Sequence, residues 1–503
     1  MSDDMGDAAG QRTYGNWLKP KTQGVIKGVG WLTSMMVFAV ALVILIFVVA
    51  GQWITALATA GLGFAAIFLI STKDKHNISQ GSKILARIGW WSAKRRRENM
   101  WRAGTLGSGP VGSVMLPGIL GRVTVSEAAD SYGRKFALIY CPRQQTYTVV
   151  FSASPMGEDL VDPEQVDVWV ARWGLMKADM ADEPGLKHFG VTIETHPANP
   201  LQLKQEVESQ AVGKASPFSL AVLSDVVESY PQGSSDVKAY LFFTYSASRK
   251  GSGRRKKRDE IIQDIAPRLG HLSQRVEASG AAACWPMDMQ ALCRYVRVAY
   301  DSKAQADLDQ ADALRQPVVL DWSQCGPMAA EASWDSYLHD GDLSVTWEMT
   351  QAPRGVVRSN ILTRFLAPQR DLVSKRVTWL YKPIPPEDTP DVVDKDVTVA
   401  DYEMSAKRPT ARARRRKRAA EQTADEQAAG AGVENFACLA TATIADSSAK
   451  QDVMATVEAL GASSRLRLRP VYGSQDSAFA ACLPLGLDTK EYTALPASYI
   501  DSL

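Results

Sequence analysis

The sequence has few of the residues that form metal and redox centres. It contains six Cys, at positions 141, 284, 293, 325, 438 and 482, and no two of them form a CxxC pair. This spacing argues against a zinc ribbon and a thioredoxin-like site, and it predicts reduced thiols buried in a core, Cys284 and Cys293 among them. The five His include no HExxH motif, so a metalloprotease site of that kind is excluded.

Motifs of common catalytic sites are also missing. The chain has no GxxxxGK[ST], no GxSxG, no kinase-type HRD or DFG set, and no Rossmann glycine pattern between a strand and a helix. The glycine-rich residues 104–117 therefore predict a linker and not a phosphate cradle. His339-Asp340-Gly341-Asp342 is the nearest approach to a metal-ligand cluster, but this composition before a strand favours a β turn. The sequence predicts no catalytic residue, no cofactor and no metal.

Charge is nearly balanced over the whole chain but not along it. The formal net charge is +2, from 57 Lys and Arg against 55 Asp and Glu. Residues 71–104 carry nine Lys or Arg and two Asp or Glu, and residues 1–70 carry four against three, which leaves −6 for residues 105–503. A basic segment therefore precedes an acidic body, and such a segment is attracted to anionic lipid.

Two long uncharged runs stand near the start of the chain, over Val29–Ala50 and Trp53–Ile70. At about 1.5 Å per residue, helices of these lengths reach roughly 33 and 27 Å, against a hydrocarbon thickness of about 30 Å. Basic residues before the first run and after the second place both ends on the cytoplasmic side. We therefore expect a two-span transmembrane hairpin in the inner membrane, with both termini cytoplasmic. A cleaved signal peptide is the alternative, but the segment before the first run is too long for one.

The second run is rich in small residues. Ala56, Thr59, Ala60 and Gly63 recur at three- and four-residue spacing, which lets two helix backbones approach closely. We expect these residues to form the contact between the two helices of the hairpin.

Residues 79–102 predict a basic amphipathic helix. Basic residues with interspersed Trp are typical of a helix that lies on a membrane surface. The residues expected to contact that surface are Lys83, Arg87, Trp90, Trp91, Lys94, Arg95, Arg96 and Arg97. The alternative is a solvated basic helix that packs its apolar side on the body.

The rest of the chain predicts α+β structure. Strands are expected over Arg122–Ser126, Lys135–Cys141, Thr146–Ser152, Gly190–Thr195, Val237–Ser246, Leu343–Thr350, Arg376–Pro383, Glu434–Ile444 and Arg465–Tyr472, with a short one near Ala282–Trp285. Helices are expected over Asp162–Met180, Pro217–Ser229, Asp259–Val276, Asp288–Tyr300, Val356–Leu366, Lys450–Leu460 and Gln475–Cys482, and over 394–430 with a break at Pro409. No repeat of fixed period is visible.

These elements suggest an α+β fold class: an N-terminal two-helix transmembrane hairpin followed by a cytoplasmic body of two to three mixed α/β units. The expected segments are a polar tail (1–23), the hairpin (24–71), the basic juxtamembrane helix (72–104), a first α+β domain (105–255), a second α+β unit (256–390), a charged helical segment (391–433) and a C-terminal αβ unit (434–503).

Two basic runs interrupt the body, over Arg249–Arg258 and Lys407–Arg418. Such runs can hold the phosphates of nucleic acid or lipid. Neither run contains an aromatic residue that would stack on an unpaired base, so a solvated loop and a solvated helix face are the simpler interpretations. The candidate nucleic-acid contacts are Arg254, Arg255, Lys256, Lys257 and Arg258.

Several short motifs occur in a recognisable order. They are Tyr14-Gly15-Asn16-Trp17, Leu116-Pro117-Gly118, Thr146-Tyr147-Thr148-Val149-Val150, Gly326-Pro327, Tyr337-Leu338-His339-Asp340-Gly341, Thr346-Trp347-Glu348-Met349, Arg465-Leu466-Arg467-Leu468-Arg469, Tyr472-Gly473-Ser474-Gln475, Phe479-Ala480-Ala481 and Leu483-Pro484-Leu485-Gly486. This set resembles a family of actinobacterial two-helix integral membrane proteins associated with conjugative, type IV-like secretion. More distantly, the chain is similar to the E component of type VII secretion and to the N-terminal domain of conjugative transport ATPases, whose motor domain it lacks.

The resemblance implies a non-enzymatic inner-membrane scaffold subunit of a secretion apparatus. Such a subunit would contact membrane lipids, a secretion ATPase and other membrane subunits, and it could form a homo-oligomer. The alternatives are a membrane-anchored enzyme whose site is assembled from residues distant in sequence, and a membrane tether for nucleic acid that acts through the two basic runs.

Overall fold

The computed structural model describes most of the chain. The described residues are 13–15, 17, 31–72, 74, 76, 78, 80–104, 107, 114–157, 161–197, 216–229, 235–248, 255–316, 318–353, 356–369, 371–405 and 408–492. Most of the predicted polar tail and the predicted contact at Arg254 lie outside these residues.

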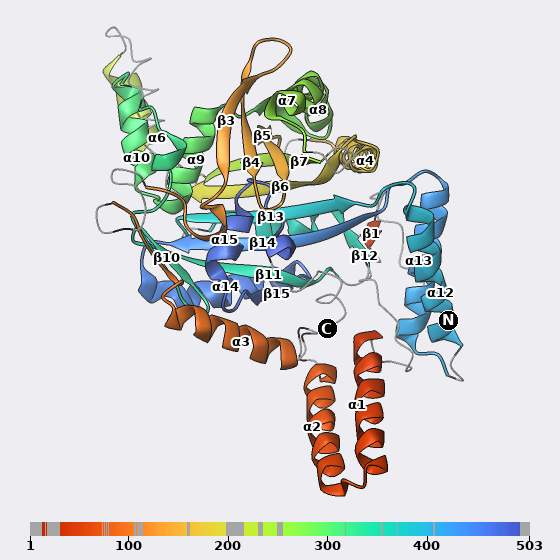
Figure 1. Cartoon of the computed structure of the whole chain (residues 1–503). Helices are drawn as coiled ribbons and strands as arrows, with labels where there is room; N and C mark the ends of the chain where they lie inside the picture. The colour runs from red at the N-terminus through yellow and green to blue at the C-terminus, as the bar shows by residue number, and fades with distance from the viewer. Residues whose placement is uncertain are drawn as a thin grey trace.

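An antiparallel sheet of 13 strands forms the centre of the molecule (Figure 1). Its strands are β2 (Met100–Arg102), β3 (Thr124–Ala129), β4 (Lys135–Cys141), β5 (Thr146–Pro155), β6 (Leu186–Pro197), β7 (Ser235–Ser246), β8 (Ala281–Pro286), β9 (Ala329–Ala332), β10 (Tyr337–His339), β11 (Asp342–Gln351), β13 (Ser374–Pro383), β14 (Glu434–Ile444) and β15 (Arg467–Pro470). They lie in the order β2-β9-β10-β11-β14-β13-β6-β7-β5-β4-β3, with β15 beside β11 and β8 beside β5. A separate pair joins β1 (Thr13–Gly15) to β12 (Val356–Arg358).

Helices cover the sheet and extend from it. They are α1 (Trp31–Val49), α2 (Trp53–Ser71), α3 (Gln80–Arg95), α4 (Pro163–Asp179), α6 (Pro217–Ser229), α7 (Arg258–Ile265), α8 (Leu269–Ala278), α9 (Met289–Tyr300), α10 (Ala304–Ala313), α11 (Thr363–Leu366), α12 (Thr389–Met404), α13 (Ala411–Ala428), α14 (Lys450–Ser463) and α15 (Gln475–Cys482).

The body is an internal duplication. In the first repeat (residues 124–300) the hairpin β3–β4 precedes a β-α-β-β-α-β unit made of β5, α4, β6, β7, α7–α8 and β8, and α9 follows. In the second repeat (residues 329–482) the hairpin β9–β10 precedes β11, α11, β13, β14, α14 and β15, and α15 follows. The two units have the same strand order, β8-β5-β7-β6 and β15-β11-β14-β13. This order is the split βαβ arrangement.

The residue pairs confirm that the repeats correspond strand by strand. On β5 and β7, Thr146 lies opposite Ser246 and Thr148 opposite Thr244. On β11 and β14, Ser344 lies opposite Thr443 and Thr346 opposite Thr441. The hydroxyl oxygens are 2.9 Å apart in the Thr148–Thr244 pair and 2.8 Å apart in the equivalent Ser344–Thr443 pair. The same polar pair therefore occupies the same place in both repeats.

The two repeats meet at β6 and β13, which run antiparallel and pair from Phe189–Tyr381 to Thr195–Lys375. Gly190 on β6 lies over the Phe242 ring and the Trp379 carbonyl, where any Cβ would collide with both. A single sheet thus passes through both repeats. The prediction of a body made of two to three separate mixed units is therefore wrong. The residue pattern of each strand is local and gave no sign that β6 pairs with β13.

Three apolar cores stabilise this sheet. On one face, α4 and α8 cover the first repeat around Phe136, Val149 and Phe243, and α11 and α14 cover the second around Trp347. On the opposite face, α9 and the segment that begins at α15 share one core, in which Phe479 packs on Tyr300 of α9 and Gly486 lies on Thr148 and Thr244 of the first repeat. The end of the second repeat is therefore buried on the first.

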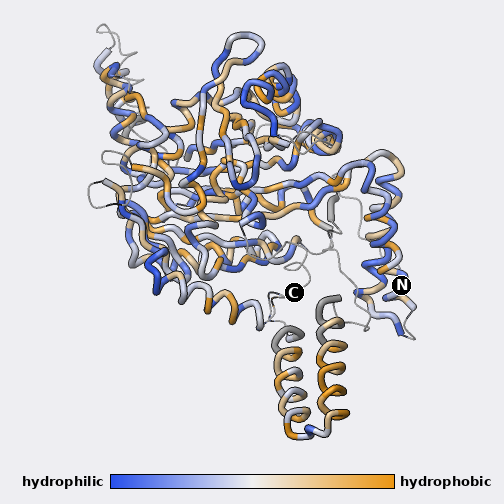
Figure 2. The backbone as a smooth tube through the Cα atoms, in the orientation of Figure 1, coloured by the Kyte–Doolittle hydropathy of each residue, from blue (hydrophilic) through white to orange (hydrophobic). Residues whose placement is uncertain are grey.

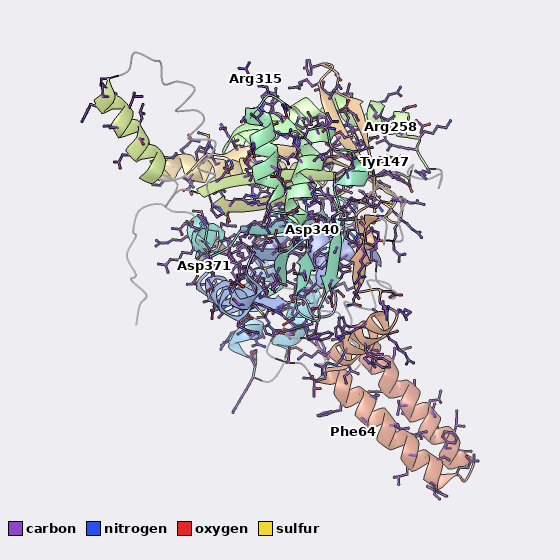
Figure 3. The ribbon with its side chains drawn as sticks, turned by 90° about the vertical axis from the view of Figure 1, so that its left-hand side faces the viewer. Phe64, Tyr147, Arg258, Arg315, Asp340 and Asp371 are labelled. Carbon is purple, nitrogen blue, oxygen red and sulfur yellow. The ribbon has the colours of Figure 1, made fainter. Side chains whose placement is uncertain are left out.

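The helices α1 and α2 form an antiparallel pair that extends from the body, and Phe64 lies on α2 along this pair (Figures 1 and 3). Hydrophobic residues run along both helices (Figure 2). Each helix has 19 residues, a length of about 28 Å. Among the residues that the structure describes, no helix is both long and apolar enough to cross a membrane. The expected two-span transmembrane hairpin and the expected inner-membrane location are therefore wrong.

Two other expectations need correction. The helix expected over Val356–Leu366 is a three-residue strand followed by a 3-10 turn and the four-residue α11. The basic helix ends at Arg95 and not at Arg102, because Arg97 has φ 58° and the next residues form β2. The break expected at Pro409 is confirmed, since it lies between α12 and α13.

Candidate functional site

The outer side of α3 exposes a row of apolar side chains. Ile84, Leu85, Ile88 and Trp91 are 44%, 59%, 58% and 59% exposed. Their spacing of three and four residues places them on one side of the helix. We call these four residues the α3 stripe. An amphipathic helix normally turns such a stripe toward the core, and α3 does not.

The opposite side of α3 holds the helix on the body. The Trp90 ring lies edge-on to Trp334, with centroids 5.4 Å apart, and the Arg87 guanidinium lies 5.5 Å from the same ring. Trp334 in turn stacks on Tyr472 at 5.7 Å. Lys83 pairs at 2.6 Å with Asp74 of the segment that precedes the helix. The helix is therefore attached through its aromatic and basic side chains.

A cavity of about 560 Å³ lies between α3 and the body. Its lining includes Lys83, Arg87, Trp334, Arg469 and Tyr472. Two cations at its wall are compensated locally, since Arg469 pairs with Glu348 at 2.8 Å and Lys83 pairs with Asp74. Burial raises the pKa of Asp74, but hydrogen bonds from Lys83 and from backbone amides outweigh it and lower the pKa to about 2. The cavity wall thus serves mainly to fix α3.

The residues expected to contact a membrane surface do not share one side of α3. Lys83, Arg87 and Trp90 face the body, and Lys94 lies 5.0 Å from the Trp90 ring. Arg95 lies 5.6 Å from the Trp91 ring on the outer side. Beyond these, Arg96 pairs with Glu98 at 2.6 Å, and Arg97 is exposed in the turn after the helix. The simpler sequence interpretation, in which the apolar side packs on the body, is wrong, because that side is the exposed one.

The residues expected at the α1–α2 contact lie on one side of α2. Ala56 and Gly63 are buried, while Thr59 and Ala60 are half-buried. A Cβ on Gly63 would collide with the Val40 side chain of α1. The Thr59 hydroxyl donates to backbone carbonyls of its own helix.

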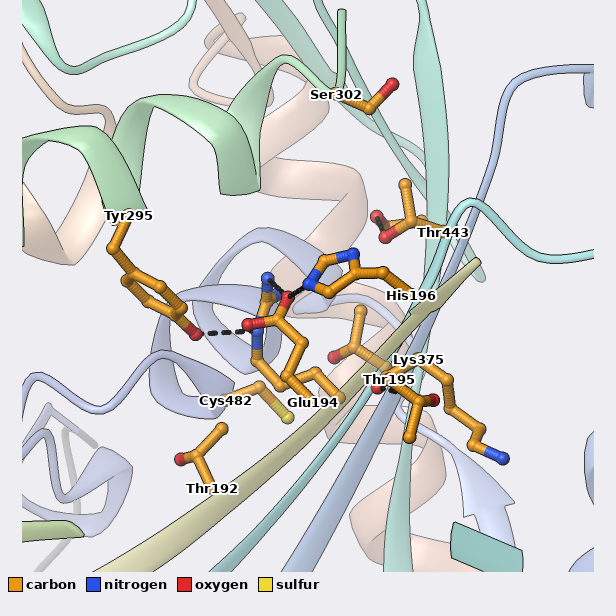
Figure 4. A network of polar contacts seen from close by, with 12 residues as sticks. Thr192, Glu194, Thr195, His196, Tyr295, Ser302, Lys375, Thr443 and Cys482 are labelled. Atoms are coloured by element: carbon orange, nitrogen blue, oxygen red, sulfur yellow. Dashed lines mark hydrogen bonds and ion pairs between the residues drawn. The ribbon is translucent and has the colours of Figure 1, made fainter. Parts of the chain in front are cut away.

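A buried polar belt crosses the sheet at the junction of the repeats, on the face covered by α9 and α15. We use this name for Glu194, Thr192, Arg376 and Thr378 on the paired strands β6 and β13 (Figure 4). Arg376 pairs with Glu194 at 2.5 Å, and both side chains are at most 2% exposed. Tyr295 of α9 accepts a hydrogen bond from Arg376 at 3.0 Å. The Thr192 and Thr378 hydroxyl oxygens are 2.9 Å apart.

Electrostatics keep the ion pair of this belt charged. Burial raises the pKa of Glu194, but the Arg376 guanidinium and the nearby His196, 3.4 Å away, outweigh it and lower the pKa. Burial also raises the pKa of Tyr295 well above its usual value, so the phenol stays protonated. Since a buried pair stabilises little but is costly to break, the belt fixes how the two repeats meet.

The chain end closes over the belt. The Thr378 hydroxyl donates to the Cys482 carbonyl at 2.6 Å, and His188 bonds to the Gly486 carbonyl at 3.1 Å. Gly486 has φ 69° and lies on the Thr148 and Thr244 hydroxyls, where no side chain fits. The belt is therefore covered by the segment after α15. Sequence reasoning missed this belt, although charged residues inside two otherwise apolar strands were its visible signal.

His339 has a structural role. Its Nδ1 donates to the Tyr300 carbonyl at 2.6 Å, and its Nε2 accepts from the Ser344 hydroxyl at 2.8 Å. The expected β turn after it is confirmed, since Asp340 and Gly341 have φ 45° and 101° between paired strands. Within the described ranges, no group of three or more His, Cys, Asp or Glu is placed to hold a metal ion. The six Cys are free and buried, as expected.

The first basic run binds its own repeat where it is described. Arg255 lies 4.4 Å from the Tyr140 ring, Lys256 pairs with Asp264 at 2.5 Å, and Arg258 donates to Ser126 at 3.0 Å. Figure 3 shows Arg258 beside the first repeat. Lys257 is exposed. These contacts engage three of the four cations of the run that the structure describes.

The second basic run lies at the start of α13, on the helical hairpin that α12 and α13 form. Arg416 is buried and pairs with Glu403 at 3.7 Å, and Lys417 pairs with Asp401 at 3.0 Å. The remaining described arginines of the run are exposed. Comparison of the sequence with protein-family models and with curated proteins found no match.

Proposed function

We propose that this chain is a non-enzymatic scaffold subunit of a transfer apparatus of the secretion type, and that another protein subunit docks on the α3 stripe. The observation that carries the proposal is the orientation of α3. Its aromatic and basic side is fixed on Trp334, while Ile88 and Trp91 point away from the body.

The chemistry of the stripe favours a protein partner. Trp and Arg are enriched among the residues that dominate protein interfaces, and the stripe combines Trp91 with Arg95 stacked on its ring. The stripe belongs to a rigid support, so binding needs little ordering of the helix. The secretion ATPase suggested by the sequence resemblance is the partner that we expect.

The test is site-specific photocrosslinking in cells that express the complete apparatus. A photoreactive amino acid at Leu85 should form a crosslink to one subunit of the apparatus, identified by mass spectrometry. The matched control has the same photoreactive amino acid in place of Leu175 of α4, because that leucine is 66% exposed on another helix. Leu175 should give no crosslink to this subunit.

Substitution gives a second measure. Ile88→Asp with Trp91→Ala should reduce co-purification of the crosslinked subunit by at least tenfold without lowering the melting temperature, because both side chains are exposed. A crosslink of equal yield at both leucines, or full co-purification by the double variant, would contradict the proposal.

A second candidate is contact of the same stripe with an anionic lipid surface. It is favoured by the cations that follow the stripe, since a helix with Trp and Leu on one side and Lys and Arg beside them binds such surfaces. Vesicles with and without anionic lipid distinguish the two. Cosedimentation of the unmodified chain with vesicles that requires anionic lipid, and that the double variant has lost, supports lipid contact. Equal cosedimentation of the unmodified chain and the double variant eliminates it.

A further inference from the structure

The exposed arginines at the start of α13 form a second surface, independent of α3. They are Arg408, Arg412, Arg414, Arg415 and Arg418, and all five side chains are exposed. None of them has an ion-pair partner among the described residues. The other two described cations of the run, Arg416 and Lys417, pair with acidic residues of α12 or α13. The hairpin therefore neutralises its inner cations and leaves the outer ones unpaired.

The position of these cations is unfavourable for the helix itself. The start of an α-helix carries the positive end of its dipole, so Arg412 and Arg414 in the first turn of α13 are repelled by it. Arg414 and Arg418 are four residues apart, and like charges at this spacing also repel. The acidic residues Glu421, Asp425 and Glu426 occupy the later part of the helix, where the dipole disfavours them too. Helix stability does not explain this arrangement.

The exposed face lacks the residues that other partners need. Between Ala411 and Arg418 the helix has only Ala, Arg and Lys. A protein interface needs apolar or aromatic anchors at its centre, and a lipid-binding helix needs side chains that enter the acyl region. Binding of nucleic acid to phosphates needs only the cations.

We infer that the arginine face of α13 binds the phosphate backbone of duplex nucleic acid without reading its sequence. From Arg412 to Arg418 the helix rises about 9 Å, which spans two to three phosphates of one strand at about 3.4 Å each. A guanidinium is well suited to bidentate phosphate contacts. The absence of aromatic residues between Ala411 and Arg418 gives no means of stacking on unpaired bases.

The test uses the full chain and 30-base-pair duplexes of two unrelated sequences in a fluorescence anisotropy titration. Two to three phosphate contacts predict a slope of log K against log salt of about −1.8 to −2.7, hence an affinity about 12 to 40 times weaker at 200 mM than at 50 mM salt. The two sequences should bind equally. A preference of more than tenfold for one sequence would contradict a contact made only to phosphates.

The variant Arg412→Gln, Arg414→Gln, Arg415→Gln and Arg418→Gln should lose at least tenfold in affinity at 50 mM salt and most of the salt slope. Its melting temperature should stay the same or rise, because repulsion within α13 is removed. The control variant has the same change in charge at the scattered exposed residues Arg122, Arg315, Arg358 and Arg364, and it should bind as the unmodified chain does.

Three results would overturn the inference: unchanged binding by the α13 variant, an equal loss in the control variant, or no duplex binding at 50 mM salt. The result does not depend on the α3 stripe, so failure of one proposal leaves the other intact.

Discussion

Glu194 and Arg376 carry opposite charges in the middle of the sheet, where both side chains are at most 2% exposed. Each residue belongs to a different repeat, so the pair forms only when β6 and β13 meet in the observed register. A register shift of one residue would leave both charges buried and unpaired, which costs several kcal/mol. At the scale of residues, the pair therefore specifies the junction more than it stabilises it.

Removing the charge of Glu194 or of Arg376 alone should destabilise the fold far more than removing both charges. Glu194→Gln or Arg376→Met should each lower the free energy of unfolding by about 3–5 kcal/mol, because the remaining group stays buried without its partner. Glu194→Leu combined with Arg376→Met should lie closer to the unmodified chain than either single variant. Urea denaturation measures all three. Single variants that each cost less than 1 kcal/mol would contradict the role given to the pair.

Two buried histidines make stability depend on pH. Burial lowers the pKa of His188 and of His339 to about 4, whereas an unfolded His has a pKa of about 6.5. Between these values the unfolded chain binds protons that the folded chain does not, so the free energy of unfolding falls as pH falls from 6.5 to 4. The contribution is fully present above pH 6.5 and amounts to about 3 kcal/mol for each residue.

Urea midpoints at pH 7 and pH 4.5 measure this dependence. His339→Gln should be less stable at pH 7, since it loses two hydrogen bonds, but it should lose less stability on acidification. The control is His271→Gln, because His271 is exposed and should leave the pH dependence unchanged. Parallel curves for His339→Gln and the unmodified chain would contradict the assignment.

Among the elements, α3 shows how a docked helix can differ from its sequence pattern. Its apolar residues predicted a side facing either a membrane or the core, and the structure turns them outward because Trp334 and Tyr472 offer an aromatic platform to Trp90 and Arg87. Cation–π and ring contacts of this kind contribute about 0.5–1.5 kcal/mol each. A few such contacts are enough to select one side of a short helix.

Loss of the platform should release α3 alone. Trp334→Ala should raise amide hydrogen exchange over residues 80–95 by at least tenfold and leave α9 unchanged, because α9 belongs to a buried core. Trp285→Ala is the control, since Trp285 is 55% exposed on β8 and remote in the sheet from α3. Unchanged exchange over α3 in Trp334→Ala would show that the helix is held by other contacts.

Local patterns predicted most elements but not their partners. Alternation and turn residues located β4, β5, β7, β11, β13 and β14 to within a few residues, because these signals belong to each strand. They could not show that β6 pairs with β13, since that contact joins residues almost 190 positions apart in the chain. The helix expected over Val356–Leu366 failed because Val and Ile fit a strand as well as a helix there.

The candidate sites were predicted only in part. The cations of α3 and α13 were visible as charge runs, but only the structure separates those that are paired from those that are free. The sequence did not identify Glu194 and Arg376 as a site. Whether a charged residue in a strand is buried depends on which distant strand pairs with it, and the sequence pattern does not show this. The duplication was missed because the equivalent pairs Thr148–Thr244 and Ser344–Thr443 lie among residues that otherwise differ.

At the scale of the whole molecule, the two repeats behave as one folding unit. They share the β6–β13 ladder and one core, in which Phe479 of the second repeat packs on Tyr300 of the first and Leu485 follows it. Neither repeat therefore buries its own apolar surface completely. Stability that depends on a shared core is lost from both parts together.

Hydrogen exchange in increasing urea tests this unity. Peptides from β5 and from β11 should lose protection at the same urea concentration, and Glu194→Gln should shift both by the same amount. Loss of protection in one repeat at a clearly lower concentration would show that the repeats unfold separately.

The antiparallel junction has a geometric consequence for the connections that leave the sheet. The β6–β7 connection contains α6, and the corresponding β13–β14 connection contains α12 and α13. Because β6 and β13 point in opposite directions, these connections emerge at opposite poles of the molecule (Figure 1). The sheet therefore lies between α6 and α13. A molecule bound to α6 and a molecule bound to α13 would be held apart by the width of the body.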